Sequence, residues 1–478
     1  MGMAEEPQTM RTNARWRNLP ATYRETEMTQ LAGWIAASES GVVLGLPGVG
    51  RATLLGYLCY RPDALARYLP PGITAQLVAV DLHDLPDHRL ATFYRIILRA
   101  FYENREQFTE AQQQAIVAIF RRYETAAQDA FLPQSGLREL LQLLQADDVR
   151  VVLVLNRFDR FLYSATPQMT RTLRGLRDAF KGTLSYILGM EQEGIYLSGI
   201  ESAAPLRTLL DTYVCWVGPL SPADGLDMIR RQTAREKEMP ASTANHLLSL
   251  TGGYPALLRV ACSWWLAAAP LPPQPEWTAV LNQQPNVRHR LQELWQSLTQ
   301  DEQLALSELV KMEAHPSARR AISAASDLAQ ALRQLARKGV CRQTSPTEWR
   351  IVGELVAAFI AAQEGISRGK LWRDARTGFI YQGRQQIEGL APQEMAVLAY
   401  LLENPFVRHT HDDLIENAWP PDVHAAGLTT GAVYQAIRGI RTQIEPDPSN
   451  PVYLITRRGS RDGGYQLFPE GRPHSDSD

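Results

Sequence analysis

Gly45-Leu46-Pro47-Gly48-Val49-Gly50-Arg51-Ala52-Thr53 decides the fold of the first half of this 478-residue chain. The apolar run Val42-Val43-Leu44 precedes it, and Leu54 and Leu58 follow it at helical spacing. A glycine frame of this spacing between a buried strand and a helix is typical of a phosphate-binding loop, because backbone N–H groups and the helix N-terminus converge on an anion. We therefore predict a strand–loop–helix unit with an anion cradle at residues 45–53.

Two side chains of the loop depart from the usual phosphate-loop signature. Arg51 stands where a lysine reaches the terminal phosphates, and Ala52 stands where a serine or threonine hydroxyl holds magnesium. Arg51 keeps a positive charge, although its planar fork is not equivalent to an ammonium group, and Thr53 offers a hydroxyl to an α-phosphate. We expect ATP or ADP as the candidate cofactor and expect Mg²⁺ not to be tightly held. A second interpretation stays open, in which the loop persists only as a strand-to-helix turn.

Further apolar runs follow along the first half of the chain and alternate with amphipathic stretches. A short helix with Leu31, Trp34 and Ile35 on one face precedes the first strand. Strands that alternate with helices predict a parallel sheet covered on both faces. The predicted strands lie at residues 42–44, 77–80, 151–155, 185–188 and 213–217, and the helical stretches include 89–102 and 137–144.

Composition restricts the class of protein. The chain carries 49 Lys and Arg against 51 Asp and Glu, so its net charge neither requires nor excludes nucleic acid. No apolar run reaches membrane-spanning length and the N-terminus lacks the apolar core of a signal peptide, so we expect a cytoplasmic protein without a membrane partner. The cysteines lie far apart, which predicts reduced core thiols and no metal site. They are Cys59, Cys215, Cys262 and Cys341.

Helix signals dominate the middle of the chain. Ser221-Pro222-Ala223-Asp224 is a strong helix start, and residues 267–275 are a proline-rich stretch that we interpret as a stiff linker. Thr299-Gln300-Asp301-Glu302 is a capping box. Helices followed by a hairpin from strands at 340–341 and 349–351 predict a winged-helix domain between residues 288 and 365. Its basic residues are interpreted as part of an intramolecular packing module; they are Arg319, Arg320 and Arg333.

The glycine loop, the strand at 151–155 and Thr251-Gly252-Gly253-Tyr254-Pro255 together resemble the STAND and AAA-like ATPases, over roughly residues 20–365. In that family the strand ends in Asp-Glu, which positions magnesium and the attacking water. Asn156 and Arg157 stand there in this chain, and Asp159 lies two residues beyond. The resemblance implies a lid turn whose backbone borders the adenine. The expected nucleotide-binding residues are Gly45, Pro47, Gly48, Val49, Gly50, Arg51, Ala52, Thr53, Tyr254, Pro255 and Arg259.

These substitutions bear directly on catalysis. Phosphoryl transfer depends mostly on positioning and charge neutralisation, and the chain lacks both the magnesium ligands and the water-orienting glutamate. We expect very slow hydrolysis at best, and we assign no catalytic residue. Arg174 and Arg177 are candidates for the family's sensor and finger roles, with surface arginines on an amphipathic helix as the alternative interpretation.

The last hundred residues contain an ordered series of motifs, from Leu390-Ala391-Pro392-Gln393-Glu394 through a helix at 433–445 to a hairpin near 456–465. The series resembles the OmpR/PhoB-type winged-helix DNA-binding domain over roughly residues 372–468. The resemblance places the helix in the major groove and the hairpin in the minor groove. The predicted buried face consists of Val433, Ile437, Ile440 and Ile444. Gln435 and Arg438 are the predicted base contacts, and the other predicted DNA contacts are Thr430, Tyr434, Arg441, Arg457, Arg458 and Arg461.

The predicted fold class is a multidomain α/β plus α protein, in which a P-loop NTPase-like parallel sheet with a helical lid is followed by two winged-helix domains. The expected boundaries are a flexible N-terminus at 1–22, an ATPase-like domain at 23–218, the lid and linker at 219–275, winged helices at 288–365 and 372–468, and a disordered tail at 469–478.

We favour a DNA-binding transcriptional regulator whose degenerate, hydrolysis-deficient STAND/AAA-like module acts as a sensor or an oligomerisation scaffold. Two alternatives stay open: an active STAND-type ATPase switch, and an adaptor of a mobile-element or defence system that recruits a partner protein. The expected partner is double-stranded DNA, and self-association through the ATPase-like domain and a protein partner are further candidates. A C-terminal domain used for protein contacts is the alternative to DNA binding.

Overall fold

The computed structural model describes residues 16–472, apart from residues 83–84, 124–128, 198, 235, 269, 315–326, 347, 363–368, 376, 384, 420–429 and 458–462. The chain forms two compact units. The first contains Met1–Gly45 and Val49–Asp224, and the second contains Leu46–Gly48 and Gly225–Asp478. The division therefore falls near the expected end of the ATPase-like domain.

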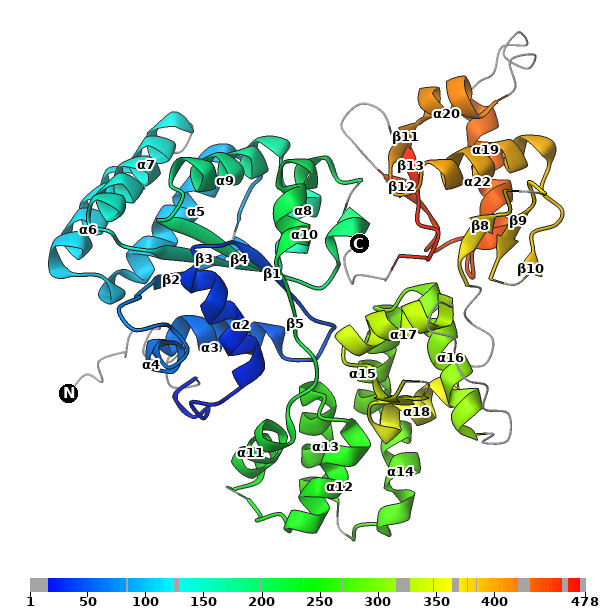
Figure 1. Cartoon of the computed structure of the whole chain (residues 1–478), viewed down its shortest axis with the longest axis horizontal. Coiled ribbons are helices and arrows are strands. Elements are labelled where there is room, and N and C mark those ends of the chain that lie inside the picture. Colours follow the sequence, from blue (N-terminus) through cyan, green and yellow to red (C-terminus); the bar gives the residue numbers. More distant parts are fainter. Residues whose placement is uncertain are drawn as a thin grey trace. The chain divides into compact units, whose positions relative to one another are not determined.

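A five-stranded parallel sheet lies at the centre of the first unit, with strand order β2-β3-β4-β1-β5 (Figure 1). Parallel neighbours need crossover connections, so helices must cover both faces; α2 and α3 lie on one face, and α5 and α9 on the other. This is the predicted P-loop NTPase-like sheet, and all five predicted strands are present. They are β1 (Gly41–Leu44), β2 (Gln76–Asp81), β3 (Val151–Asn156), β4 (Leu184–Met190) and β5 (Val214–Trp216).

Nine α-helices accompany these strands in the described part of the first unit. They are α2 (Glu25–Ala36), α3 (Arg51–Tyr60), α4 (Pro62–Ala66), α5 (Leu90–Glu103), α6 (Glu110–Tyr123), α7 (Phe131–Ala146), α8 (Phe158–Ser164), α9 (Pro167–Ala179) and α10 (Arg207–Thr212).

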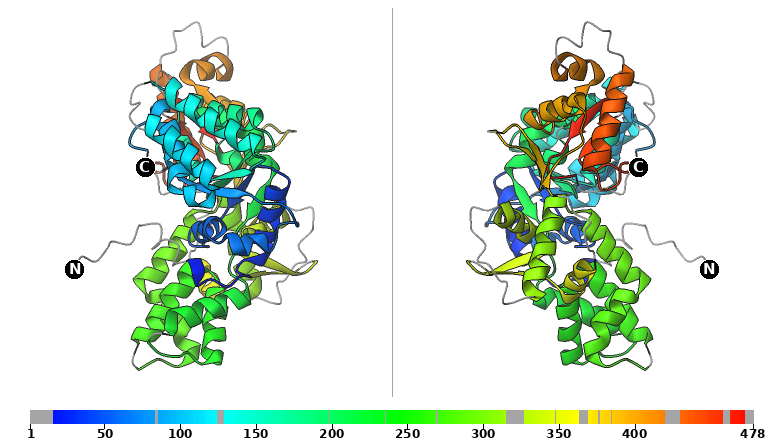
Figure 2. Two further views of the ribbon diagram at one scale, coloured as in Figure 1. Left: turned by 90° about the vertical axis from the view of Figure 1, so that its left-hand side faces the viewer. Right: turned by 90° about the vertical axis from the view of Figure 1, so that its right-hand side faces the viewer.

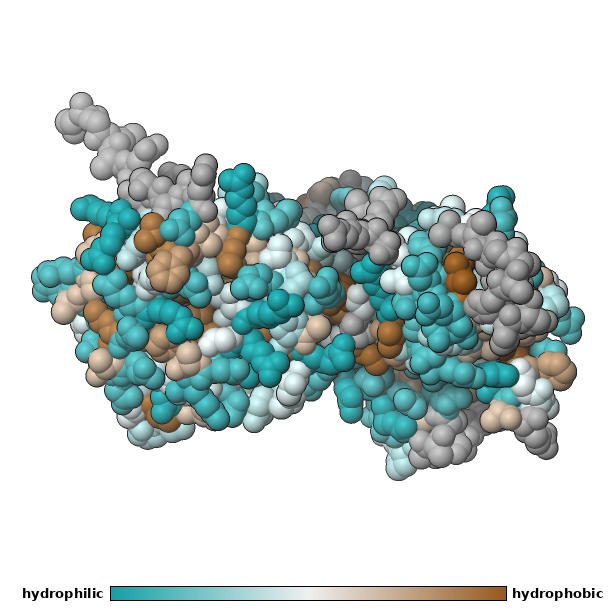
Figure 3. All heavy atoms as spheres, turned by 90° about the horizontal axis from the view of Figure 1, so that it is seen from above, coloured by the Kyte–Doolittle hydropathy of each residue, from teal (hydrophilic) through white to brown (hydrophobic). Residues whose placement is uncertain are grey.

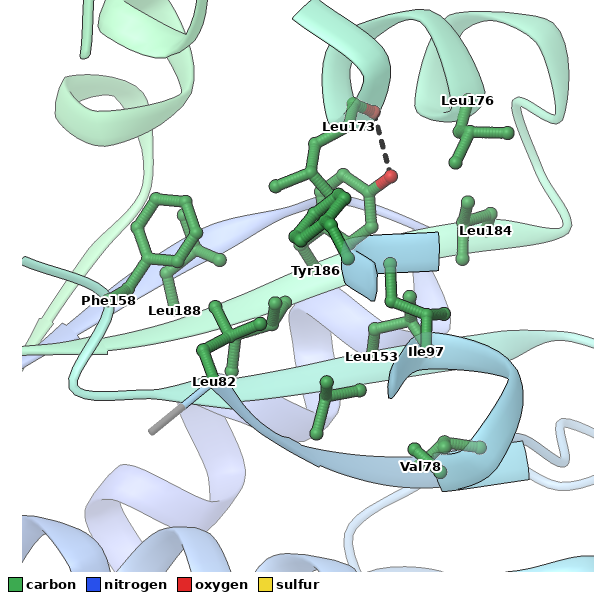
Figure 4. Close-up of a cluster of buried hydrophobic side chains, with 14 of the residues drawn as sticks. Val78, Leu82, Ile97, Leu153, Phe158, Leu173, Leu176, Leu184, Tyr186 and Leu188 are labelled. Atoms are coloured by element: carbon green, nitrogen blue, oxygen red, sulfur yellow. Dashed lines mark hydrogen bonds between the residues drawn. The ribbon is translucent and has the colours of Figure 1, made fainter. Parts of the chain in front are cut away.

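A hydrophobic core of this unit lies between the sheet and the helices α5, α7 and α9. Alternate strand residues enter it because successive side chains of a strand point to opposite faces; Leu153 on β3 and Tyr186 on β4 are both 1 % exposed. The Tyr186 hydroxyl donates to the carbonyl oxygen of Leu173 at 2.7 Å (Figure 4). This bond satisfies a polar group that burial would otherwise leave unpaired.

Residues 16–22 differ from the flexible N-terminus that the sequence predicts. Trp16 and Leu19 are each 7 % exposed, and the Arg61 guanidinium donates to both of their carbonyl oxygens at 3.0 and 2.9 Å. A Cβ on Gly56 would lie 2.3 Å from the Trp16 ring, so this position on α3 requires glycine. The prediction was wrong for these residues because the Trp16 ring of this otherwise polar segment packs against Gly56 of α3.

The first part of the second unit is a group of packed helices, shown in green and yellow in Figure 2, with one antiparallel hairpin. Residues 277–283 form a helix that the sequence analysis did not predict, and its first residue, Trp277, is 2 % exposed. The elements are α11 (Pro222–Thr233), α12 (Ala241–Thr251), α13 (Pro255–Ala267), α14 (Trp277–Gln283), α15 (Pro285–Gln296), α16 (Gln300–Ala314), α17 (Asp327–Arg337), β6 (Cys341–Ser345), β7 (Glu348–Ile351) and α18 (Glu354–Ala361).

Both predicted helix starts in this region are capped as expected. Asp224 N–H donates to the Ser221 hydroxyl at 3.1 Å. Glu302 N–H donates to the Thr299 hydroxyl at 3.2 Å, and Thr299 N–H donates back to the Glu302 carboxylate at 3.0 Å. The same carboxylate pairs at 2.7 Å with Lys338, which is 2 % exposed. The capping box therefore also joins α16 to the end of α17.

The C-terminal part of the second unit has its own core, formed around α19, α20 and α22. A three-stranded sheet of order β11-β13-β12 contains the predicted hairpin, while the small sheet β10-β9-β8 before it was not predicted. A Cβ on Gly439 would lie within bonding distance of the Glu394 carboxylate, so glycine lets α19 approach α22 closely. The elements are β8 (Leu371–Arg373), β9 (Ile380–Gln382), β10 (Gln385–Gln386), α19 (Pro392–Glu403), β11 (Arg408–Thr410), α20 (His411–Ala418), α22 (Thr430–Ile444), β12 (Leu454–Arg457) and β13 (Gly464–Leu467).

Hydrophobic residues lie scattered among hydrophilic ones on the face seen in Figure 3. Within the described residues, no helix has the length and apolar character needed to cross a membrane. All four cysteines are buried and free of disulfides, which confirms the expected core thiols. Burial raises the pKa of the Cys59 thiol to about 12.

Candidate phosphate loop and nucleic-acid interface

The glycine loop connects β1 to α3 with a backbone that suits an anion. Gly48 and Gly50 adopt positive φ values of 81° and 90°, a conformation that glycine reaches without strain. Helix α3 begins at Arg51 without a side-chain cap, so its first N–H groups have no partner within the helix. Val49 is fully buried and anchors the loop. The left-handed glycines and the uncapped start of α3 are the backbone features that the predicted cradle requires.

The Arg51 side chain is turned to partners within the first unit. One terminal nitrogen donates to the Gly45 carbonyl oxygen at 3.2 Å, and the other donates to the Glu191 carboxylate at 3.1 Å. Only 7 % of the Arg51 side chain is exposed. The charge that was expected to meet phosphate is thus neutralised by a carboxylate that follows β4.

The side chains around the loop do not fit a magnesium ion held in the usual way. Ala52 carries no hydroxyl, and the Asn156 amide oxygen is buried without a hydrogen-bond partner among the described residues. Asp159 is 3 % exposed, and its carboxylate accepts the N–H groups of Glu191 and Gln192 at 2.9 and 3.2 Å. Burial raises the pKa of Asp159, although the Arg51 charge opposes the rise. Asp159 therefore caps the turn after β4.

The residues predicted to form the lid turn lie in the second unit. Pro255 begins α13, and Ala256 N–H donates to the Gly48 carbonyl oxygen at 3.1 Å within that unit. The Tyr254 side chain is 1 % exposed, and its hydroxyl donates to the Gly339 carbonyl oxygen at 3.1 Å. Arg259 is exposed. Arg174 and Arg177 on α9 pair with Asp178 at 3.7 and 3.1 Å, in keeping with surface arginines.

Arg24 is a residue near the loop that the sequence analysis missed. It has a left-handed backbone with φ 52° and is 2 % exposed. Its guanidinium donates to the Val49 carbonyl oxygen at 2.5 Å and to Glu27 at 2.7 Å, and its N–H donates to Asp224 at 3.2 Å. Arg24 thus joins Val49 of the loop to Asp224 within the first unit. No local pattern marks it, because Asp224 lies 200 positions away in the chain.

Helix α22 presents a buried face and an exposed face, as predicted. Val433, Ile440 and Ile444 are fully buried and Ile437 is 2 % exposed. On the opposite face Tyr434 is 56 % exposed, and Gln435 and Arg438 are exposed as well. Gln and Arg can form paired hydrogen bonds to base edges in a major groove. They lie three residues apart and so occupy the same side of the helix.

Arg441 was predicted as a DNA contact, but its side chain is bound within the domain. Its guanidinium donates to the Leu454 carbonyl oxygen at 2.9 and 2.6 Å and to the Thr456 hydroxyl at 2.8 Å. Desolvation lowers the pKa of Arg441. The side chain therefore joins α22 to β12. Helical position alone could not reveal this, because Arg441 points along the helix edge where the hairpin packs.

The remaining predicted contacts belong to the hairpin and the start of α22. Arg457 donates to the Gln466 amide oxygen at 2.7 Å across the hairpin. Arg458 and Arg461 lie outside the described residues, as does the wing tip between them, and the side chain of Thr430 is likewise not described. Arg319 and Arg320 of the central domain also fall outside the described residues.

Glu445 holds the end of α22 on the hairpin and was not predicted as an important residue. It is fully buried, and its carboxylate accepts the N–H groups of Val452, Tyr453 and Leu454 at 2.7 to 3.1 Å. Burial raises the pKa of Glu445, while these backbone donors oppose the rise. A carboxylate is suited to this position because both of its oxygens accept hydrogen bonds.

Comparison with known proteins shows that the C-terminal domain is similar to a domain of transcriptional regulatory proteins. Residues 385–467 match the family described as "Transcriptional regulatory protein, C terminal". The chain is 36 % identical over 77 residues to transcriptional regulatory protein YvrH of Bacillus subtilis, covering 16 % of this chain and 30 % of YvrH. It is also 36 % identical over 78 residues to alkaline phosphatase synthesis transcriptional regulatory protein SphR of Synechococcus elongatus, covering 16 % and 28 %. The match thus spans less than a third of each relative.

Among solved structures, the Walker-type ATPase PABY2304 of Pyrococcus abyssi is similar to a larger part of the chain. The match covers 70 % of this chain and 95 % of the PABY2304 chain, with 15 % sequence identity and a TM-score of 0.40. The P-loop NTPase-like assignment of the first unit rests on the strand order and the glycine loop described above.

Proposed function

We propose that this chain is a DNA-binding transcriptional regulator whose C-terminal winged-helix domain reads duplex DNA through α22. The observation that carries the proposal is the exposed face of this helix, with Tyr434, Gln435 and Arg438 opposite a fully buried stripe. The names of the two relatives, which describe transcriptional regulatory proteins, support the same conclusion. In this proposal Gln435 and Arg438 contact base edges, while Arg441 positions the helix.

Selection of bound duplexes from a random library, followed by footprinting with the intact chain, tests this proposal. We expect one short protected sequence, because base-edge contacts discriminate among base pairs. Binding that is equal for all duplexes and depends only on salt would indicate phosphate contacts alone and would contradict the proposed operator recognition.

In the same proposal the P-loop NTPase-like domain is a sensor or scaffold without hydrolytic activity. Ala52 and Asn156 offer no ligand that could hold magnesium as the usual hydroxyl and carboxylate do. ATP or ADP is the proposed ligand of the loop backbone. The domain is also the proposed surface for self-association, which sedimentation of the intact chain would measure.

We expect no release of phosphate from ATP above the uncatalysed background, with or without duplex DNA. The physical reason is that neither the metal nor the attacking water has a positioned protein ligand. Phosphate release by the intact chain should be measured with magnesium present and with magnesium chelated. Turnover that requires magnesium would instead support the active ATPase switch.

A further inference from the structure

Two basic and two acidic side chains gather where β1 and β4 end in the first unit. These strands are neighbours in the sheet, and Gly45 N–H donates to Met190 at 3.2 Å. Glu191 follows immediately, and its carboxylate lies 3.1 Å from Arg51 and 3.8 Å from Arg160. The backbone of Glu191 is held by the buried carboxylate of Asp159. The carboxylate of Glu191 is therefore fixed beside the first turn of α3.

Arg51 has both terminal nitrogens engaged by this arrangement. One donates to Gly45, the first residue of the glycine loop, and the other donates to Glu191. The side chains of Arg51 and Glu191 are 7 % and 23 % exposed, so water screens the pair less than it screens a surface ion pair. A phosphate that required the Arg51 charge would have to displace a carboxylate that is already in place.

We propose that Glu191 is an intramolecular competitor of nucleotide phosphate for Arg51. The loop backbone keeps its anion cradle, while the only cation in the described part of the loop is occupied by the chain's own carboxylate. Glu191 therefore lowers the affinity of the loop for ADP and ATP, and Arg51 contributes little to the binding of either nucleotide. This inference rests on the proposed binding of ATP or ADP to the loop and is independent of DNA recognition by the C-terminal domain. Absence of nucleotide binding in every variant would contradict the proposed ligand, whereas binding that Glu191 does not affect would contradict the competition.

Titration of the intact chain with ADP and with ATP, each with magnesium chelated, tests the competition. We expect Glu191→Gln to raise the affinity about tenfold or more, because it releases Arg51 toward the phosphates. Glu191→Asp keeps the charge but withdraws it by one methylene, so a smaller rise in the same direction is expected. The matched control is Glu139→Gln, which removes an equal charge from an exposed residue that pairs with Arg122 and should leave affinity unchanged.

The second arm of the experiment asks whether Arg51 is the group released. Arg51→Ala should change nucleotide affinity less than threefold in the natural chain but should abolish the gain in the Glu191→Gln background. A thermal melt of each variant checks that the first unit stays folded. The proposal is overturned if neither Glu191 variant gains affinity, or if the gain survives when Arg51 is removed.

Discussion

Replacing Gln435 and Arg438 by alanine should lower the affinity of the intact chain for its selected DNA site about 100-fold. Each side chain that pairs with a base edge contributes about 1 to 3 kcal/mol of discrimination, and a loss of about 2.7 kcal/mol is a hundredfold change in affinity. Both residues are exposed on α22, so their removal leaves the core intact. Affinity for unrelated duplexes should fall only a few-fold. Fluorescence anisotropy at one fixed salt concentration measures both quantities.

Arg373→Ala is the matched control for this experiment. Arg373 is 41 % exposed and pairs with Glu403 at 2.6 Å, so its replacement removes the same charge from another face of the domain. It should not change the ratio of specific to non-specific affinity. An equal loss in both kinds of affinity for the α22 variant would mean that these residues contact phosphates instead of bases.

Replacing Glu445 by alanine should destabilise the C-terminal domain by about 3 kcal/mol. The change leaves three buried N–H groups without an acceptor, and each unsatisfied buried group costs about 1 to 3 kcal/mol. Glu445→Gln should also destabilise the domain, because its amide presents an N–H group where a second acceptor is needed. The carboxylate joins the end of α22 to β12, so the loss should be confined to this domain.

Hydrogen–deuterium exchange of the intact chain measures this local stability. Peptides from β12 and β13 should lose about 100-fold of their protection in Glu445→Ala, since about 2.7 kcal/mol corresponds to that factor. Peptides from β1 and β4 in the first unit should be unchanged. Glu416→Ala, a change at an exposed glutamate on α20, should stay within about 0.5 kcal/mol of the natural chain. Full protection in Glu445→Ala would show that the hydrogen bonds of the Glu445 carboxylate contribute little to the stability of the domain.

Local patterns of apolar residues in the sequence determined the helices and strands and which face of each is buried. Apolar runs separated by amphipathic stretches predicted the parallel sheet, and the spacing of Val433, Ile437, Ile440 and Ile444 predicted which side of α22 is buried. Both predictions depend only on the local pattern of apolar residues, which is a property of short stretches of the chain. For the same reason, the glycine frame of the phosphate loop and the exposed positions of Gln435 and Arg438 were visible without a structure.

The tertiary structure alone decided which partners the charged side chains meet. Arg51 pairs with a carboxylate 140 positions away, and Arg24 bonds to Asp224 across 200 positions. Strand order brings β1 beside β4, and no local pattern encodes that neighbour. Arg441 and Glu445 likewise found their partners on a hairpin that packs on α22. Sequence periodicity fixes where a side chain points, whereas its electrostatic partner depends on which distant segment the fold places beside it.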